Sequence, residues 1–377
     1  MKVALVHDHL AQDGGAEKVL QVLMEIYPNA PIYTLLCEKN IEKKHYNDRV
    51  IFTSIIQRLP GGVKLYQWYL PLMPMAVEFF DLTDYDVVIS DTSSFAKGVI
   101  TSPDTLHICY CHTPTRYLWS DTHEYIRELK YNKYFKKIIS LILNYVRLWD
   151  RAAADRVDEY IANSDTIAKR IKKYYKRDSS IIYPPVEVDN FAINNEEKND
   201  HDKYFLTGCR LTPYKRTDLA VEAFKENKKK LKIFGDGPDM KRLKKMAGGA
   251  GNIEFLGRVD DERLKTLYSQ CQAFLNPQEE DFGITCVEAM ASGRPVIAYR
   301  AGGARETIIE NKTGIFFDSQ DVGSLNKAIE KYYDIEFNPK EIKEHADQFS
   351  KNAFKKQIKE FVAEKYREFR GPAMERE

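Results

Sequence analysis

Two carboxylates lie on either side of a glycine turn in the stretch 276–293, NPQEEDFGITCVEAMASG. Glu280 precedes the turn Phe282-Gly283, and Glu288 falls inside a segment with the hydrophobic spacing of a helix. The helix dipole and the free N–H groups at the helix start form an anion site suited to a phosphate. These N–H groups belong to Gly283, Ile284 and Thr285. A solvated turn followed by a helix with a surface Glu would give the same pattern.

A second glycine turn follows the first expected strand, residues 2–6. The pair Gly14-Gly15 precedes a helical pattern and can admit a phosphate or a sugar close to the backbone, or can simply make the turn. The segment lacks the GxGxxG fingerprint, and the acidic residue that binds ribose in a dinucleotide site is not evident. These two absences argue against a dehydrogenase.

The pattern of strands and helices around these turns predicts a parallel sheet. Strand patterns at 32–35, 49–52, 87–90 and 105–110 alternate with helical patterns. Ligands of such sheets bind at the carboxyl ends of the strands. Because the last of these strands leads directly into His112, this histidine is a candidate site residue, although a lone histidine is usually structural.

Length and composition exclude several classes of protein. The chain has 377 residues, for which two α/β domains of roughly 180 residues each are the natural expectation. Its 57 Lys and Arg residues nearly cancel its 56 Asp and Glu residues, so no global field favours nucleic acid. We see no apolar run of the about 20 residues that span a bilayer, and no signal peptide. Six scattered cysteines fit reduced thiols in a cytoplasmic protein, and no metal-binding cluster is evident.

The continuation of the acidic turn carries a family resemblance. After the two carboxylates, with seven residues between them, comes SGRPVIAYRAGGARETI with the pair Gly302-Gly303. This pattern resembles the donor-sugar site of retaining glycosyltransferases of family four, the glycosyl transferases group 1. The resemblance extends over nearly the whole chain, and YCHTPTRYLW around His112 is similar to a bacterial mannosyltransferase subgroup of polysaccharide and O-antigen synthesis.

The resemblance implies the GT-B fold, an α/β architecture of two Rossmann-like domains facing across a cleft. We expect residues 1–190 to form an N-terminal acceptor-binding domain and residues 191–350 a C-terminal domain that binds the nucleotide sugar. A C-terminal helix, residues 351–377, is expected to return and pack on the first domain.

The resemblance also implies roles for single residues. In the family an Arg and a Lys grip the donor diphosphate, and they match Arg210 and Lys215. Fixed cations suit this role because the leaving group gains charge as the glycosidic bond breaks. Glu280 would bind the sugar hydroxyls near the reacting face, Glu288 the ribose hydroxyls, and His112 the donor sugar near the acceptor. The implied catalytic set is Glu280, His112, Arg210 and Lys215, and the implied donor-binding set is Gly14, Gly15, Arg210, Lys215, Arg258, Phe282, Gly283, Ile284, Thr285 and Glu288.

The implied reaction moves a hexose from a nucleotide-diphosphate sugar, with GDP-mannose favoured by the subgroup, to a glycan or lipid-linked glycan. Transfer would retain the anomeric configuration through same-face attack, with the leaving phosphate oxygen accepting the acceptor proton. No metal and no cofactor is expected. The alternatives are an epimerase or phosphorylase of the same fold, and a nucleotide-sugar-binding protein without turnover.

One further segment suggests a location. Residues 127–151 are basic and amphipathic, and residues 55–80 are rich in aromatic and aliphatic side chains. A basic amphipathic helix can lie on an anionic membrane surface. We therefore expect a cytoplasmic protein with a peripheral contact to the inner face of the cell membrane; the alternative is that these apolar faces only pack on their own domain.

Overall fold

The computed structural model describes residues 1–12, 14–194 and 203–371. The chain forms two compact units, Met1–Tyr183 with the stretch from Phe354 onward, and Pro184–Ala353. Residues just after Tyr183 belong to unit 2 because the Val186 N–H donates to the Phe349 carbonyl at 3.0 Å. The division therefore falls a few residues before position 190.

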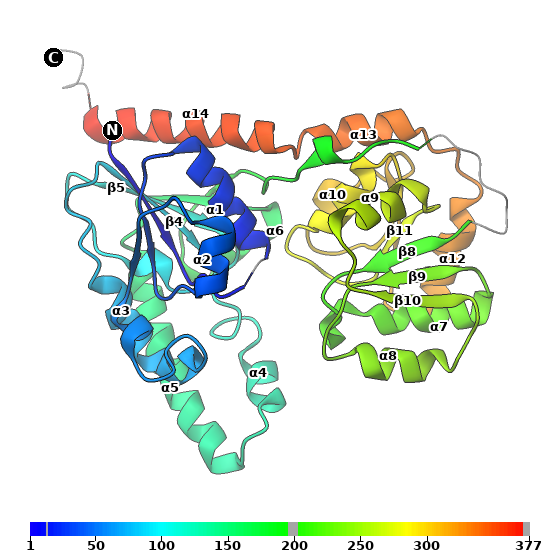
Figure 1. Ribbon diagram of the computed structural model, residues 1–377, viewed down its shortest axis with the longest axis horizontal. Coiled ribbons are helices and arrows are strands. Elements are labelled where there is room, and N and C mark those ends of the chain that lie inside the picture. The colour runs from blue at the N-terminus through cyan, green and yellow to red at the C-terminus, as the bar shows by residue number, and fades with distance from the viewer. Residues whose placement is uncertain (13, 195–202, 372–377) are drawn as a thin grey trace. The chain divides into compact units, whose positions relative to one another are not determined.

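Unit 1 is built on a seven-stranded parallel sheet in the order β3-β2-β1-β4-β5-β6-β7 (Figure 1). Every residue of β1, β4 and β5 is buried, as expected for strands with both faces covered. The chain runs outward from β1 and returns to β4 on its other side, so a topological switch point lies between these two strands. The strands are β1 Val3–His7, β2 Ile32–Thr34, β3 Ile51–Thr53, β4 Val87–Thr92, β5 Leu106–Cys111, β6 Glu159–Ala162 and β7 Ser180–Ile181.

The helices of unit 1 begin at recognisable caps. At α1 the Glu17 side chain accepts from the Gly14 N–H, and at α5 the Asn132 side chain accepts from two N–H groups of the first turn. The α-helices are α1 Gly15–Ile26, α2 Lys39–His45, α3 Met73–Glu78, α4 Thr122–Glu128, α5 Lys133–Ala154 and α6 Asp165–Tyr174, with short 3₁₀ helices η1 Ile55–Arg58, η2 Tyr66–Leu72 and η3 Ala96–Gly98.

The segment 127–151 is not one helix, contrary to the sequence interpretation. Helix α4 ends at Glu128, and α5 begins only at Lys133 because Asn132 caps a new helix there. Figure 1 shows the first turns of α5 extending away from the sheet, next to α4. The C-terminal helix α14, Lys351–Arg370, packs on unit 1. Its Phe354, Ile358 and Val362 side chains are buried in the hydrophobic cluster that contains β1 and β5 side chains.

Unit 2 repeats the architecture with a six-stranded parallel sheet in the order β10-β9-β8-β11-β12-β13 (Figure 1). Its strands are β8 Phe205–Gly208, β9 Leu231–Phe234, β10 Ile253–Gly257, β11 Phe274–Asn276, β12 Val296–Tyr299 and β13 Gly314–Phe317. Its helices are η4 Val188–Asn190, η6 Pro213–Lys215, α7 Thr217–Asn227, α8 Met240–Ala247, α9 Asp261–Gln270, α10 Ile284–Ala291, α11 Ala304–Thr307, α12 Val322–Tyr332 and α13 Pro339–Asp347. The expectation of two Rossmann-like domains is confirmed.

Two absences hold for the described part of the chain. No helix there is both long and apolar enough to cross a membrane. Nor do three or more His, Cys, Asp or Glu side chains in the described ranges gather in a way that could hold a metal ion.

Candidate functional site

The acidic turn lies at the carboxyl edge of the unit 2 sheet. Strand β11 ends at Asn276, the turn follows, and α10 begins at Ile284 as the sequence predicted. Gly283 caps this helix with φ +94°, a left-handed conformation that favours glycine. Because β8 pairs with β11, the loop after β8 and the acidic turn meet at the same edge.

Glu280 and Lys215 form an ion pair at this edge. The Lys215 ammonium donates to Glu280 Oε1, and the Gln278 amide donates to the same oxygen at 2.8 Å. Burial disfavours the charge on Lys215, but the Glu280 carboxylate outweighs it, so the pKa of Lys215 is raised. Two residues expected to contact the donor are therefore held side by side.

The glycine pair of the family pattern fixes the acidic turn from behind. The Gly303 N–H donates to the Glu280 carbonyl at 2.8 Å, and a Cβ on Gly302 would lie only 2.1 Å from that same oxygen. Any side chain at Gly302 would push the Glu280 backbone away. The pair is thus needed to hold Glu280 next to Lys215.

Glu288 lies inside α10 and is buried, which excludes the alternative of a surface carboxylate. It accepts a hydrogen bond from the Tyr268 hydroxyl at 3.1 Å. Two buried polar groups also flank the turn without a hydrogen-bond partner among the described residues, the side-chain amide of Asn276 and the hydroxyl of Thr285. Buried polar groups in proteins normally have a hydrogen-bond partner. The Asn276 amide and the Thr285 hydroxyl could therefore bond to a ligand or to water.

The remaining donor-side residues differ in their exposure to solvent. Arg210 follows β8 and is exposed, and Phe282 is buried against Phe349. Arg258 follows β10, is almost fully exposed, and has Asp236 Oδ2 at 3.8 Å from its Nε. No contact in the described residues joins Arg258 to the Glu280–Lys215 pair.

The predicted residues of unit 1 meet at the carboxyl edge of its sheet, near the switch point. His112 Nε2 lies 2.6 Å from Asp91 Oδ1, and Asp91 Oδ2 lies 2.8 Å from His7 Nδ1. His7 Nε2 is 3.9 Å from Glu17 Oε1, and the other oxygen of Glu17 accepts from the Gly14 N–H at 3.0 Å. The Gly14-Gly15 turn and His112 are therefore ends of one continuous polar chain.

Charges along this chain are set by burial and neighbours. Burial disfavours the charged form of His7, but Asp91 and Glu17 outweigh it and raise its pKa to about 10. Burial likewise opposes ionisation of Asp91, yet His112 and His7 lower its pKa. Asp91 is thus a buried carboxylate held between two imidazoles, a role that sequence reasoning missed for both Asp91 and His7.

The loop after β4 is fixed by another buried carboxylate. Asp8 accepts from the Thr92 hydroxyl at 2.7 Å, from the Ser93 N–H at 2.7 Å, and from the Phe95 and Ala96 N–H groups at 2.8 Å. Burial opposes its ionisation, but the charge of His7 and these donors lower the pKa of Asp8. The loop is consequently rigid where it borders the cavity described next.

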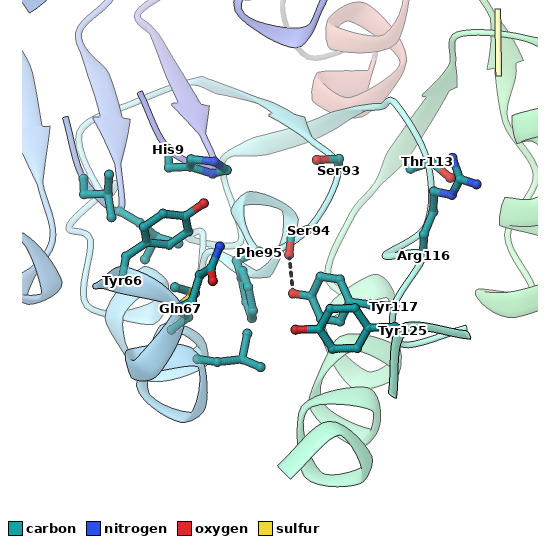
Figure 2. A pocket seen from close by; sticks show the side chains of 14 residues that line it. His9, Tyr66, Gln67, Ser93, Ser94, Phe95, Thr113, Arg116, Tyr117 and Tyr125 are labelled. Atoms are coloured by element: carbon teal, nitrogen blue, oxygen red, sulfur yellow. Dashed lines mark hydrogen bonds between the residues drawn. The ribbon is translucent and has the colours of Figure 1, made fainter. Parts of the chain in front are cut away.

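A cavity of about 350 Å³ opens beside this edge of unit 1 (Figure 2). Figure 2 shows Tyr66 and Gln67 on one side and Tyr117 and Tyr125 on the other, with the Phe95 ring between them. The Ser94 hydroxyl lies 3.1 Å from the Tyr117 hydroxyl. The whole lining is His9, Leu35, Leu36, Tyr66, Gln67, Leu70, Met73, Ser93, Ser94, Phe95, Thr113, Arg116, Tyr117 and Tyr125. Mostly apolar walls with a few polar groups are typical of a site for an organic ligand.

The expected site residues therefore divide between the units. His112, Gly14 and Gly15 lie at the carboxyl edge of the unit 1 sheet. All the others belong to unit 2, where the structure brings Glu280 and Lys215 into contact.

Two family models match the chain, and together they reach across both units. Residues 13–190 match the model described as Glycosyltransferase Family 4, and residues 188–356 match Glycosyl transferases group 1. These are the families that the sequence pattern indicated.

Curated relatives match parts of the chain. An alpha-1,3/1,6-mannosyltransferase ALG2 of Dictyostelium discoideum is 25% identical over 64% of this chain and 66% of its own length. A GDP-mannose-dependent alpha-(1-6)-phosphatidylinositol monomannoside mannosyltransferase of Mycolicibacterium smegmatis is 31% identical over 39% of this chain and 44% of its own. An uncharacterised glycosyltransferase of Methanocaldococcus jannaschii is 27% identical over 54% of this chain and 58% of its own. The chain thus matches between 44% and 66% of these relatives' lengths.

Solved structures share the fold at low identity. Anabaena Alr3699/HepE in complex with UDP is 18% identical with a TM-score of 0.70, covering 97% of this chain and 100% of its own. A sucrose-phosphate synthase of Thermosynechococcus elongatus is 16% identical with a TM-score of 0.74, covering 97% and 99%.

Proposed function

The chain belongs to the family 4, group 1 glycosyltransferases, and on that premise we propose that it is a retaining hexosyltransferase that moves a sugar from a nucleotide diphosphate to a glycan or lipid-linked glycan. The observation that carries the proposal is the ion pair between Lys215 and Glu280 at the start of α10. It sets a cation and a carboxylate side by side at the sheet edge where a charged sugar donor would bind.

In this proposal the unit 2 site binds the donor in three parts. Lys215 and Arg210 bind the diphosphate, and the N–H groups at the start of α10 add to this anion site. Glu280 accepts hydrogen bonds from the sugar hydroxyls. Glu288, oriented by Tyr268, accepts from the ribose hydroxyls.

For the transfer step we propose the course that the family resemblance implies. The bond between the anomeric carbon and the phosphate oxygen breaks, and the acceptor oxygen forms its bond to that carbon from the same face. The leaving phosphate oxygen takes the acceptor proton, while Lys215 and Arg210 stabilise the charge that develops on it. Glu280 and Glu288 do not act as the carboxylate pair of a glycosidase, because that chemistry requires both carboxylates beside one glycosidic bond.

For the sugar we propose mannose donated by GDP-mannose. The support is that two of the relatives described above carry mannosyltransferase names, one of them with GDP-mannose in its name. On the acceptor side we propose the cavity of unit 1, because its lining includes aromatic rings and Thr113, the residue after His112.

For the location we propose peripheral contact with an anionic membrane through α5. Leu143 and Val146 face the core of unit 1, whereas Leu141, Tyr145 and Leu148 on the same helix are exposed. The alternative, that the apolar face only packs on its own domain, explains the inward residues alone. Exposed apolar side chains on a surface helix are expected where that face meets a membrane or a partner.

A donor screen followed by product analysis tests the proposal. Nucleotide sugars are compared by the mass of ligand-bound protein, and the bound donor is then incubated with and without glycan acceptors. We expect GDP-mannose to bind best and the mannosyl group to appear on the acceptor. Epimerised or phosphorolysed donor in reactions without acceptor would instead identify the alternatives within the same fold.

A further inference from the structure

One glutamine joins three loops at the carboxyl edge of the unit 2 sheet. Gln320 lies between the end of β13 and the start of α12. Its side-chain oxygen accepts from Arg216 Nη1 at 3.1 Å, and its side-chain nitrogen donates to the Pro277 carbonyl at 2.8 Å. The Gln320 carbonyl also lies 3.5 Å from Arg216 Nη2. Gln320 therefore bridges the loop after β8, which carries Arg216, and the acidic turn after β11, which begins at Pro277.

Both ends of this bridge are close in sequence to the ion pair of the candidate site. Arg216 directly follows Lys215, and Pro277 lies three residues before Glu280. We call residues 209–216 the cationic loop, because they include Arg210, Lys215 and Arg216. The bridge joins the cationic loop to the acidic turn in addition to the Lys215–Glu280 pair itself.

The backbone of Arg216 is held in an unfavourable conformation. Its φ of +50° and ψ of +29° are left-handed, which L side chains such as arginine rarely adopt. Arg216 is the N-cap of α7 and directly follows η6, whose last residue is Lys215. The guanidinium contacts Gln320 on one side and has Asp218 Oδ1 at 3.5 Å from Nε. Because strained backbone persists only where surrounding contacts hold it, these contacts fix the turn that directs Lys215 towards the site.

A bound donor would compete for both members of the ion pair. In the proposed function Lys215 also binds the diphosphate and Glu280 also accepts from sugar hydroxyls. The bond from Gln320 to the Pro277 carbonyl joins neutral groups and does not involve either of these charges. We propose that Gln320 and Arg216 are positioning residues, which hold the cationic loop and the acidic turn at a fixed separation while the donor binds and reacts. The inference rests on the proposed function and deepens it at the same site.

The alternative is that these contacts only stabilise the packing of two helices. Helices α7 and α12 pack together in the hydrophobic cluster of unit 2. They are also joined at a second place, where the Asn227 amide donates to Asn326 Oδ1 at 2.8 Å. Asn227 ends α7, whereas Arg216 precedes its first residue, so this second bond lies at the opposite end of the helix. Asn326→Leu is therefore a matched control for Gln320→Leu.

The first test measures the ion pair without donor and without catalysis. Acetic anhydride reacts with the uncharged form of an amine, so the labelling rate of Lys215, followed by mass spectrometry, reports its pairing with Glu280. In Gln320→Leu we expect this rate to rise at least roughly threefold, because a looser pair lowers the pKa of Lys215 and exposes its amine. Asn326→Leu should be labelled at the wild-type rate.

Amide hydrogen exchange separates the two arms of the bridge. The Arg216 N–H is hydrogen-bonded within the cationic loop, and the Gly303 N–H donates to the Glu280 carbonyl of the acidic turn. Gln320→Glu can still accept from Arg216 but cannot donate to the acidic turn. We expect this variant to exchange faster at Gly303 alone, Gln320→Leu to exchange faster at both amides, and Asn326→Leu at neither.

Steady-state kinetics with GDP-mannose and excess glycan acceptor tests the role in transfer. We expect kcat of Gln320→Leu to fall roughly 10- to 100-fold, because a small misplacement of catalytic groups costs rate on this scale. Donor KM should change little, since the proposed ribose contact of Glu288 is not altered. Asn326→Leu should keep the wild-type kcat.

Three outcomes would overturn the inference. They are unchanged labelling and exchange in Gln320→Leu, equal changes in Gln320→Leu and Asn326→Leu, and a rise in donor KM with kcat unchanged. If labelling and exchange change as expected but wild type transfers no sugar, the proposed function fails and the bridge between the loops stands. If wild type transfers sugar and Gln320→Leu does so at the same rate, the function stands and the positioning role falls.

Discussion

At the scale of single residues, the account depends on Lys215 and its partner Glu280. Replacing Lys215 by Ala removes a charge-assisted contact worth ~2–3 kcal/mol, so turnover should fall roughly 30- to 150-fold, and Arg210→Ala should give a loss of the same order. Steady-state rates with a saturating acceptor provide the measurement. Lys327→Ala, an exposed lysine on α12, is the matched control. A Lys215→Ala enzyme with near wild-type turnover would remove the diphosphate assignment.

A second residue-scale prediction concerns Asp91. Asp91→Asn keeps the shape but removes the carboxylate that holds His112 and His7. We expect kcat to fall by roughly 10²-fold with donor KM nearly unchanged, because an amide can leave His112 in the wrong tautomer. A rise in donor KM with kcat unchanged would contradict a role for Asp91 in the transfer step.

His7 gives a pH dependence of stability whose sign can be stated. Its pKa in the folded protein is raised to about 10 from 6.5, so the folded state binds the proton more tightly than the unfolded state. The stabilisation is fully present below about pH 6.5 and is lost as the pH rises towards 10. Denaturant unfolding between pH 6 and 10 should show wild type losing unfolding free energy relative to His7→Gln. Parallel curves for the two proteins would contradict the charged state of His7.

The sequence led to some of these residues and not to others for a physical reason. Glu280 and Glu288 are close together along the chain, so their spacing can be recognised from the sequence alone. His7 ends β1, Asp91 lies in β4 and His112 directly follows β5, and only the strand order β1-β4-β5 brings them together. The signal that could have revealed this cluster is the polar residue at or next to the end of each of β1, β4 and β5, which are neighbours in the sheet.

At the scale of elements, α5 is the part whose role is most readily tested. Each Lys or Arg close to an anionic leaflet contributes about 1 kcal/mol, so a few lysines give a reversible attachment that salt weakens. We expect wild type to float with anionic liposomes and not with neutral ones. Changing Lys130, Lys133, Lys136 and Lys137 to Glu should abolish flotation.

The control for this experiment is a charge change elsewhere. Lys241, Lys244 and Lys245 form an exposed lysine run on α8 of unit 2, and their replacement by Glu should leave flotation intact. If the α5 variant still floats, or if both variants lose binding equally, α5 is not the membrane contact.

The same region shows where element prediction failed. Hydrophobic spacing indicated one amphipathic segment over 127–151, but the Asn132 side chain accepts from the Tyr134 and Phe135 N–H groups and starts a new helix. Further along α5, the Trp149 indole donates inward to Glu78, whereas the neighbouring Leu148 is exposed. Periodicity does not reveal which apolar residues tertiary packing will cover.

At the scale of the whole molecule, the alternation of strand and helix patterns was sufficient to predict two parallel-sheet units, because each parallel strand requires a crossover helix. The boundary between the two units was harder to predict from the sequence. The sequence interpretation ended the first domain at residue 190, yet Val186 already pairs with Phe349, close to the last residue of unit 2. Such long-range pairing leaves no local pattern.

A whole-molecule prediction concerns metal ions. In the proposed site Lys215, Arg210 and the start of α10 supply the positive charge that a divalent cation supplies at other diphosphate sites. Transfer activity should therefore survive excess chelator. Activity that disappears with chelator and returns with added Mg²⁺ or Mn²⁺ would contradict this part of the account.

The configuration of the product tests the central claim most directly. The enzyme is incubated with GDP-mannose and a glycan or lipid-linked glycan acceptor, and the new anomeric centre is assigned by NMR from its one-bond carbon–proton coupling. Same-face attack beside Glu280 and Lys215 predicts that the transferred mannose keeps the anomeric configuration of the donor. An inverted linkage, or release of mannose to water with no linkage formed, would contradict retaining hexosyl transfer.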